Sequence, residues 1–214
     1  MGGGFSMLNN INWLGHSSIK ILGNKILYID PFNIKENYND ADIIFITHNH
    51  YDHFSKEDIA KCMNKYTKIV ITKDLYQDTI NLGFNDQQIL VVLPNNSYEI
   101  ENINFKTLPA YNINKNFHPQ KNNWVGYIIN INNQKIYVAG DTDLTDESKK
   151  VKCDIAFLPV GGTYTMDYKE ASTLANIINP SIVIPIHYGT IVGTIQDALN
   201  FKANLNANID CKIL

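Results

Sequence analysis

The sequence predicts an α/β (α+β) chain in which β-sheets pack together and helices cover them on the outside. Three observations predict this class: β-type runs dominate the first third, βα units alternate in the middle and the last third, and no linker of Pro, Gly or Ser interrupts them. Such an order of elements is typical of sheets with helices on their outer faces. A chain of 214 residues with 44% hydrophobic residues can bury one sizeable core.

The first third of the chain carries short β-type runs separated by turns. Gly23 and Asn24 form a good hairpin turn between two of these runs. Residues 43–46 are a continuous apolar run, as expected for a strand that is buried on both faces. The strands expected before this buried one lie at residues 11–14, 18–22 and 25–29.

Helical and strand patterns alternate in the rest of the chain. Ser55 resembles an N-cap, because Glu57 and Asp58 follow in the first turn, and we expect its helix to run to about residue 64. Further helices are expected at residues 75–82, 167–178 and 195–205. Further strands are expected at residues 68–72, 88–92, 103–108, 124–131, 134–139, 154–158 and 181–185, with 211–214 closing the chain. We read residues 7–214 as one domain and residues 1–6 as a remnant of cloning.

Composition narrows the range of partners. The formal net charge is −3 and all eighteen basic residues are lysines, so we expect no nucleic acid partner. No apolar run is long enough to span a membrane, and no apolar signal core follows the N-terminus. The three cysteines stand far apart in no metal-type spacing, which indicates reduced thiols and a cytoplasmic protein. No feature of the sequence sets the oligomeric state.

The strongest chemical signal is a histidine-rich heptad, Thr-His-Asn-His-Tyr-Asp-His, at residues 47–53. It holds His48, His50, Asp52 and His53 directly after the strand expected to be buried. A turn at a strand end can aim alternate side chains at one point, and imidazole and carboxylate are ligands that Zn²⁺ takes. Three of the six histidines of the chain lie in this heptad, which argues against chance surface histidines.

Other polar side chains share this position at the end of an apolar strand. Asp141 follows the run at 134–139, His187 follows the run at 181–185, and His118 lies in a loop. Singly, Asp141 could cap a helix and His187 could be a buried structural histidine. Together they predict a site at one edge of the sheets, because α/β proteins place sites at the carboxyl ends of strands.

These motifs resemble the metallo-β-lactamase fold superfamily. The heptad, Gly-Asp-Thr at 140–142 and Ile-His at 186–187 carry the resemblance to the superfamily. Three further motifs are similar to a branch of small metal-dependent hydrolases that includes ascorbate-phosphate lactonase-like proteins: Trp-Leu-Gly-His-Ser-Ser at 13–18, Ile-Asp-Pro-Phe at 29–32 and Gly-Gly-Thr-Tyr-Thr-Met at 161–166. The resemblance covers nearly the whole chain from residue 11 and implies a four-layer αβ/βα sandwich.

The resemblance also implies a site for two divalent metal ions, with Zn²⁺ first and Mn²⁺ as the alternative. His48 and His50 would bind the first ion with a third histidine, and Asp141 would bridge both ions. Asp52, His53 and His187 would bind the second ion. Relatives often carry a histidine after a Pro-Ala-aromatic turn, but Asn112 stands there in this chain. We take His118, six residues on, as the third histidine and keep the amide oxygen of Asn112 as the alternative.

The function predicted from this site is hydrolysis of a small-molecule ester, lactone or phosphoester by a metal-bridged hydroxide. Asp52 is the candidate catalytic residue, because it could orient the nucleophile or carry its proton. One alternative is a metal-binding protein of the same fold with weak or no turnover, left open by Asn112. The other is a nucleic-acid-processing hydrolase, ranked low because of the negative net charge. His16 is either a neighbour of the site or an ordinary turn histidine, and Asp30 is expected to be structural.

Overall fold

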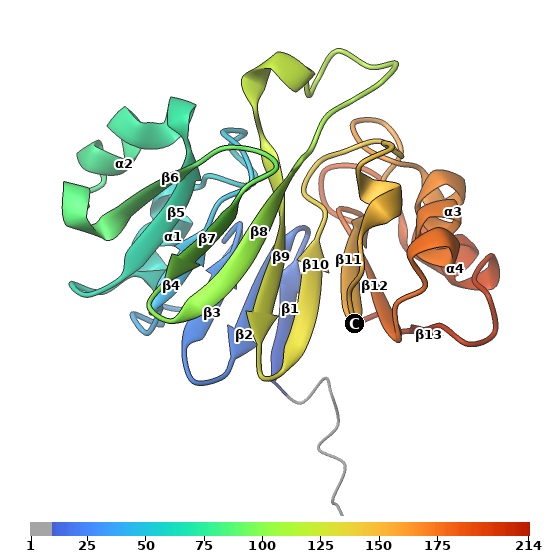
Figure 1. Ribbon diagram of the computed structural model, residues 1–214, viewed down its shortest axis with the longest axis horizontal. Helices are drawn as coiled ribbons and strands as arrows, with labels where there is room; N and C mark the ends of the chain where they lie inside the picture. Colours follow the sequence, from blue (N-terminus) through green and yellow to red (C-terminus); the bar gives the residue numbers. More distant parts are fainter. Residues whose placement is uncertain (1–9) are drawn as a thin grey trace, which may run out of the picture.

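The computed structural model describes residues 10–214, so the cloning remnant predicted at residues 1–6 lies outside the described part. Two β-sheets lie face to face in this part, and helices flank them at both sides (Figure 1).

The first sheet has six strands that follow one another in chain order. Its first two strand pairs are antiparallel and its last three pairs are parallel. The strands are β1 (Ile11–Gly15), β2 (Ser18–Leu22), β3 (Ile26–Ile29), β4 (Ile43–Phe45), β5 (Lys68–Thr72) and β6 (Ile89–Val92).

The second sheet has seven strands and runs from β13 at one edge to β7 at the other. Strands β7 to β10 pair antiparallel, and strands β10 to β13 pair parallel. They are β7 (Ser97–Ile100), β8 (Ile103–Pro109), β9 (Val125–Ile131), β10 (Gln134–Val138), β11 (Ile155–Pro159), β12 (Ile182–Ile186) and β13 (Asp210–Cys211).

The helices are short, and α1 begins at the cap that the sequence predicts. Ser55 caps α1 through its side chain, and Asp167 and Glu170 form a capping box on α3. The α-helices are α1 (Lys56–Cys62), α2 (Tyr76–Asn81), α3 (Tyr168–Ile178) and α4 (Ile195–Ala203). Single 3₁₀ turns lie at η1 (Lys73–Leu75), η2 (Asp86–Gln88), η3 (Gln120–Asn122) and η4 (Ser148–Lys150).

Alternation along the strands builds three apolar layers. On β4, Ile43 and Phe45 point into the core between the two sheets, whereas Ile44 packs on the other face with Ile59 of α1. On the second sheet, Leu158 faces α3 and joins Leu174 in a third cluster. The order helix, sheet, sheet, helix confirms the predicted αβ/βα sandwich.

The expected elements differ from the structure mainly at β7 and at helix ends. Strand β7 has the sequence Ser-Tyr-Glu-Ile with alternate residues exposed, and it was not predicted because so short an edge strand has a weak pattern. The helix expected at 75–82 begins as the 3₁₀ turn η1, and the helix expected at 195–205 ends at Ala203.

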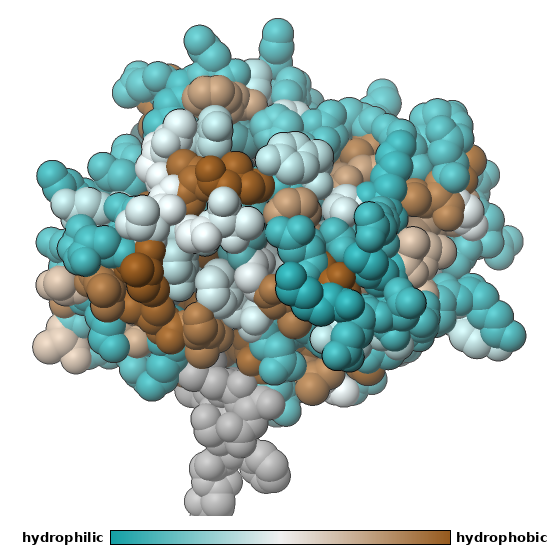
Figure 2. Space-filling view, turned by 180° about the vertical axis from the view of Figure 1, so that it is seen from behind, coloured by the Kyte–Doolittle hydropathy of each residue, from teal (hydrophilic) through white to brown (hydrophobic). Residues whose placement is uncertain are grey.

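The face seen from behind carries both hydrophilic and apolar residues (Figure 2). In the view from behind, apolar residues form small patches separated by hydrophilic ones (Figure 2). No helix among residues 10–214 has the length and apolar character needed to cross a membrane.

The two sheets are hydrogen-bonded to each other at one edge. The backbone N–H of Val125 donates to Thr47 O at 3.1 Å, and the N–H of His187 donates to His16 O at 2.9 Å. The Tyr127 hydroxyl donates to Ile46 O at 2.6 Å. The bonds to Ile46 and Thr47 hold the chain after β4 against the second sheet, and the bond to His16 holds the turn between β1 and β2 there. The candidate site lies at this edge.

Candidate metal centre

The heptad forms a tight loop at the end of β4. The N–H groups of His53 and Phe54 both donate to His50 O, at 3.0 and 2.8 Å, so the chain turns back within four residues. The buried carboxylate of Asp30 accepts hydrogen bonds from the Thr47 N–H at 2.8 Å and from its hydroxyl at 2.7 Å. Asp30 therefore fixes the start of the loop to the end of β3.

The remaining predicted residues reach the same place from the second sheet. Asp141 follows β10 and His187 follows β12, both at strand ends, as predicted. Gly140 has a φ of +66°, and an added Cβ would lie 3.0 Å from the backbone oxygen of Val125, so a side chain before Asp141 would be strained. His118 comes from the loop between β8 and β9.

The structure brings all seven predicted residues together, in groups whose ligand-type atoms lie within 4.8 Å of one another. Six of the seven fall into two groups, and Asp141 forms a third group with one histidine from each, His48 and His53. The first group consists of His48, His50 and His118. The second group consists of Asp52, His53 and His187 and also includes His16 from the turn between β1 and β2. From the sequence, His16 was either a neighbour of the site or an ordinary turn residue. Its place in the second group makes it a neighbour of the site.

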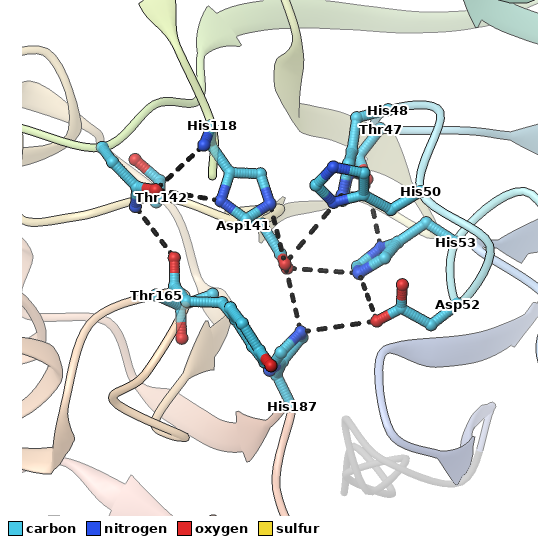
Figure 3. A network of polar contacts seen from close by, with 12 residues as sticks. Thr47, His48, His50, Asp52, His53, His118, Asp141, Thr142, Thr165 and His187 are labelled. Atoms are coloured by element: carbon cyan, nitrogen blue, oxygen red, sulfur yellow. Dashed lines mark hydrogen bonds and ion pairs between the residues drawn. The ribbon is translucent and has the colours of Figure 1, made fainter. Parts of the chain in front are cut away.

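Asp141 lies between the two groups (Figure 3). Its Oδ2 is 3.2 Å from His118 Nε2 and 3.9 Å from His48 Nε2, both in the first group. It is also 3.1 Å from His187 Nε2 in the second group, and its Oδ1 is 3.3 Å from His53 Nε2. One carboxylate therefore contacts both groups.

Three polar contacts orient the histidines. His53 Nδ1 donates to Asp30 Oδ2 at 2.7 Å, and His118 Nδ1 donates to Asn112 Oδ1 at 3.1 Å. His16 Nε2 donates to Asp52 Oδ2 at 2.9 Å. In His53 and His118 the other ring nitrogen, Nε2, is left facing Asp141. Such outer partners fix the tautomer and ring orientation of metal-binding histidines.

Several buried polar atoms of these residues have no hydrogen-bond partner. They are His16 Nδ1, His53 Nε2, His118 Nε2, Asp141 Oδ1 and both ring nitrogens of His187. Buried polar atoms without partners are rare and costly, and they mark places where an ion or another group binds. Imidazole nitrogens and carboxylate oxygens form the donor set of zinc-like ions, so the residues present fit a divalent metal.

The environment sets the charges of these groups. Burial lowers the pKa of His48 well below its usual value and also lowers that of His50. Burial opposes the proton on His53 as well, but the carboxylates of Asp141 and Asp30 raise its pKa well above the usual value. The pKa of Asp52 falls to about 2, because the hydrogen bond from His16 and nearby histidines outweigh its burial.

Strained backbone accompanies the site. His16, Asp30 and His187 have φ values of 50°, 45° and 57°, in the left-handed region that residues other than Gly and Asn seldom adopt. All three contact the two groups or hold their loop. Strain of this kind persists where surrounding contacts over-determine the conformation, as at functional sites.

Asp143 is a buried residue of this region that the sequence did not single out. Its carboxylate accepts from Asn112 Nδ2 at 3.0 Å and from Lys115 Nζ at 2.6 Å. The signal that could have found it is its place two residues after Asp141 in the same strand-end segment. Asp143 anchors Asn112, which in turn orients His118.

Comparison with known proteins places this fold and site in a family. A family model described as a beta-lactamase superfamily domain matches residues 10–187. This chain belongs to the metallo-β-lactamase superfamily. A UPF0173 metal-dependent hydrolase from Thermococcus onnurineus is 31% identical over 206 residues, which cover 90% of each chain.

Solved structures agree with this membership. A candidate metal-dependent hydrolase from Parabacteroides distasonis is 29% identical, has a TM-score of 0.78, and matches over 95% of this chain and 91% of its own. Igni18, a metallo hydrolase from Ignicoccus hospitalis, shares the fold with a TM-score of 0.78 at 23% identity, over 95% of this chain and 94% of its own. The predicted superfamily, its fold and the class of metal-dependent hydrolase are confirmed.

Proposed function

We propose that this superfamily member hydrolyses a small-molecule ester, lactone or phosphoester with two divalent ions, Zn²⁺ first and Mn²⁺ as the alternative. His48, His50 and His118 would hold one ion. The other would be held by Asp52, His53 and His187, with Asp141 bridging both. The observation that carries the proposal is the contact of the single Asp141 carboxylate with histidines of both groups.

The side chains support a hydrolytic role. Bound divalent ions supply a nucleophile at neutral pH, by lowering the pKa of water, and polarise the bond that is attacked. Asp52, the candidate catalytic residue, is ionised at neutral pH because its pKa is about 2, so its carboxylate can accept a hydrogen bond from the attacking water or move its proton. The hydrogen bond from His16 orients this carboxylate.

The contacts of Asn112 support His118 as the third histidine of the first group. Asn112 Oδ1 accepts from the His118 N–H at 3.0 Å and from His118 Nδ1 at 3.1 Å. Its amide nitrogen donates to Asp143 and to Tyr164 O. The oxygen that could bind an ion is therefore engaged with His118, and Asn112 acts as the partner that orients it.

The test combines metal content with turnover. The protein is stripped with a chelator, reloaded with Zn²⁺ or Mn²⁺, and analysed for bound metal. Hydrolysis of p-nitrophenyl acetate, bis-p-nitrophenyl phosphate and a γ-lactone is then measured. Two ions per chain and hydrolysis that disappears on chelation and returns on reloading are expected. Two ions without hydrolysis of any probe would favour the metal-binding alternative.

We also propose that the protein is cytoplasmic and that its substrate is a small molecule rather than a nucleic acid. All three cysteines are free thiols, as a reducing compartment requires.

A further inference from the structure

The candidate metal centre opens to the surface through a pocket of about 240 Å³. Site residues such as His50, Asp52 and His187 form its floor. A volume below the roughly 300–1,000 Å³ of most ligand sites indicates a small substrate.

Apolar side chains from separate loops form the rim of this pocket. Tyr51, Phe117, Tyr164 and Ile191 line it together with the metal-binding candidates. Phe117 and Tyr164 meet edge to face, with ring centroids 4.7 Å apart. Tyr51, Phe117 and Ile191 remain 67%, 46% and 36% exposed, and the informative point is that they gather at one pocket. We call these four residues the apolar rim.

The loops that carry the ligand candidates also carry three of the four rim residues, Tyr51, Phe117 and Ile191. Tyr51 lies between His50 and Asp52, and Phe117 directly precedes His118. Because each ligand sits at the pocket floor, its neighbour in the chain is held at the mouth. A substrate attached at the metals therefore extends over the apolar rim.

No cationic side chain lines the pocket. The chain has no arginine, and Lys115, in the loop that carries Phe117, is bound to Asp143 at 2.6 Å and to Thr165 O at 2.8 Å. A negative charge on the part of the substrate that lies over the rim would lose part of its water without gaining a cationic partner. Burial of an unpaired charge is strongly unfavourable.

We propose that the substrate carries an uncharged, apolar group on the part that extends from the metals over the apolar rim. The inference rests on the proposed function and narrows its substrate class. It favours neutral acyl esters, lactones or amides of short apolar chains, and it excludes substrates with a phosphate or carboxylate tail at this position.

The test uses hydroxamates, because a hydroxamate chelates metal ions and so fixes which end of the probe lies at the centre. Hexanohydroxamate, adipic acid monohydroxamate and 6-aminohexanohydroxamate have the same chain length and end in a methyl, a carboxylate and an ammonium group. Their Kd values are measured by calorimetry on the zinc-loaded protein. Hexanohydroxamate is expected to bind about tenfold more tightly than the adipic probe.

A lysine placed on the rim should reverse this preference. Phe117→Lys is expected to bring the adipic probe to equal or tighter binding than hexanohydroxamate, because the new ammonium pairs with its carboxylate. Ile191→Lys tests the same point on a loop that does not carry His118. Ile113→Lys is the matched control, since Ile113 is 56% exposed and lies outside the pocket. Metal content is measured in every variant.

The outcomes separate this inference from the proposed function. Equal binding of the three probes, or tighter binding of the adipic or amino probe, would overturn the apolar substrate and leave the metal centre intact. The amino probe is included because aromatic rims can also hold cations. Failure of the zinc-loaded protein to bind any hydroxamate would instead refute the proposed function.

Discussion

The two groups of the metal centre share the loop after β4 but differ in burial and in the origin of their other ligands. Every member of the second group is buried, and Asp30 braces His53 from β3. In the first group His50 is only partly buried, and His118 comes from a loop and is braced by another loop residue, Asn112. Rigid elements hold ligands more precisely than loops. We expect the ion of the first group to bind more weakly.

The largest effect is expected from the one residue that both groups share. Asp141→Ala should remove both ions, because it deletes the carboxylate that contacts both groups. Elemental analysis of the purified variant measures this. Asp146→Ala, which removes an exposed carboxylate five residues on, is the control and should keep full metal content. Unchanged metal content in Asp141→Ala would refute the bridging assignment.

Removal of one histidine from each group tests the difference between them. His118→Ala should lose the first ion and keep the second, whereas His187→Ala should lose the second. Stepwise chelation of the wild-type protein, followed by elemental analysis, should release the ion of the first group before the other. If both ions leave together in each experiment, the two groups act as one site and the comparison is wrong.

Loss of a residue that only orients a ligand should lower metal affinity less than loss of the ligand itself. Asn112→Ala is expected to lower the affinity of the first group for its ion by about 10- to 100-fold, the usual effect of losing an outer partner of a metal-bound histidine. Metal titration with a competing chelator measures the change. Asn114→Ala, an exposed neighbour in the same loop, is the control. An equal loss for both variants would mean that Asn112 only stabilises the loop.

The smallest expected effect is the number of protons released when the metal ions bind. His53 has a raised pKa and is protonated at neutral pH without metal, whereas His48 and His50 have lowered pKa values and are already neutral. A ligand must lose its proton, so binding at the second group should release a proton from His53 and weaken as pH falls. Calorimetry in two buffers of different ionisation enthalpy measures this release. Greater release on filling the first group would contradict the assignment.

The fold could be predicted well because its signals are local. The apolar run at β4, the cap at Ser55 and the hairpin turn at Gly23 each appear within a few residues. Strand β7 escaped prediction because its four residues at a sheet edge are half exposed and carry little pattern. Helix ends were displaced because end residues depend on caps and 3₁₀ turns more than on propensity.

The sequence by itself determined the residue types of the centre and their place at strand ends. The heptad, Asp141 and His187 follow apolar strands, and the carboxyl ends of parallel strands meet at one edge. Only the tertiary structure decided the contacts between distant segments: His16 with Asp52, Asn112 with His118, and the apolar rim over the pocket. The physical reason is that these contacts form only when the two sheets pack together. Which side chains meet across the sheets depends on the whole core, so the local sequence carries no pattern that predicts them.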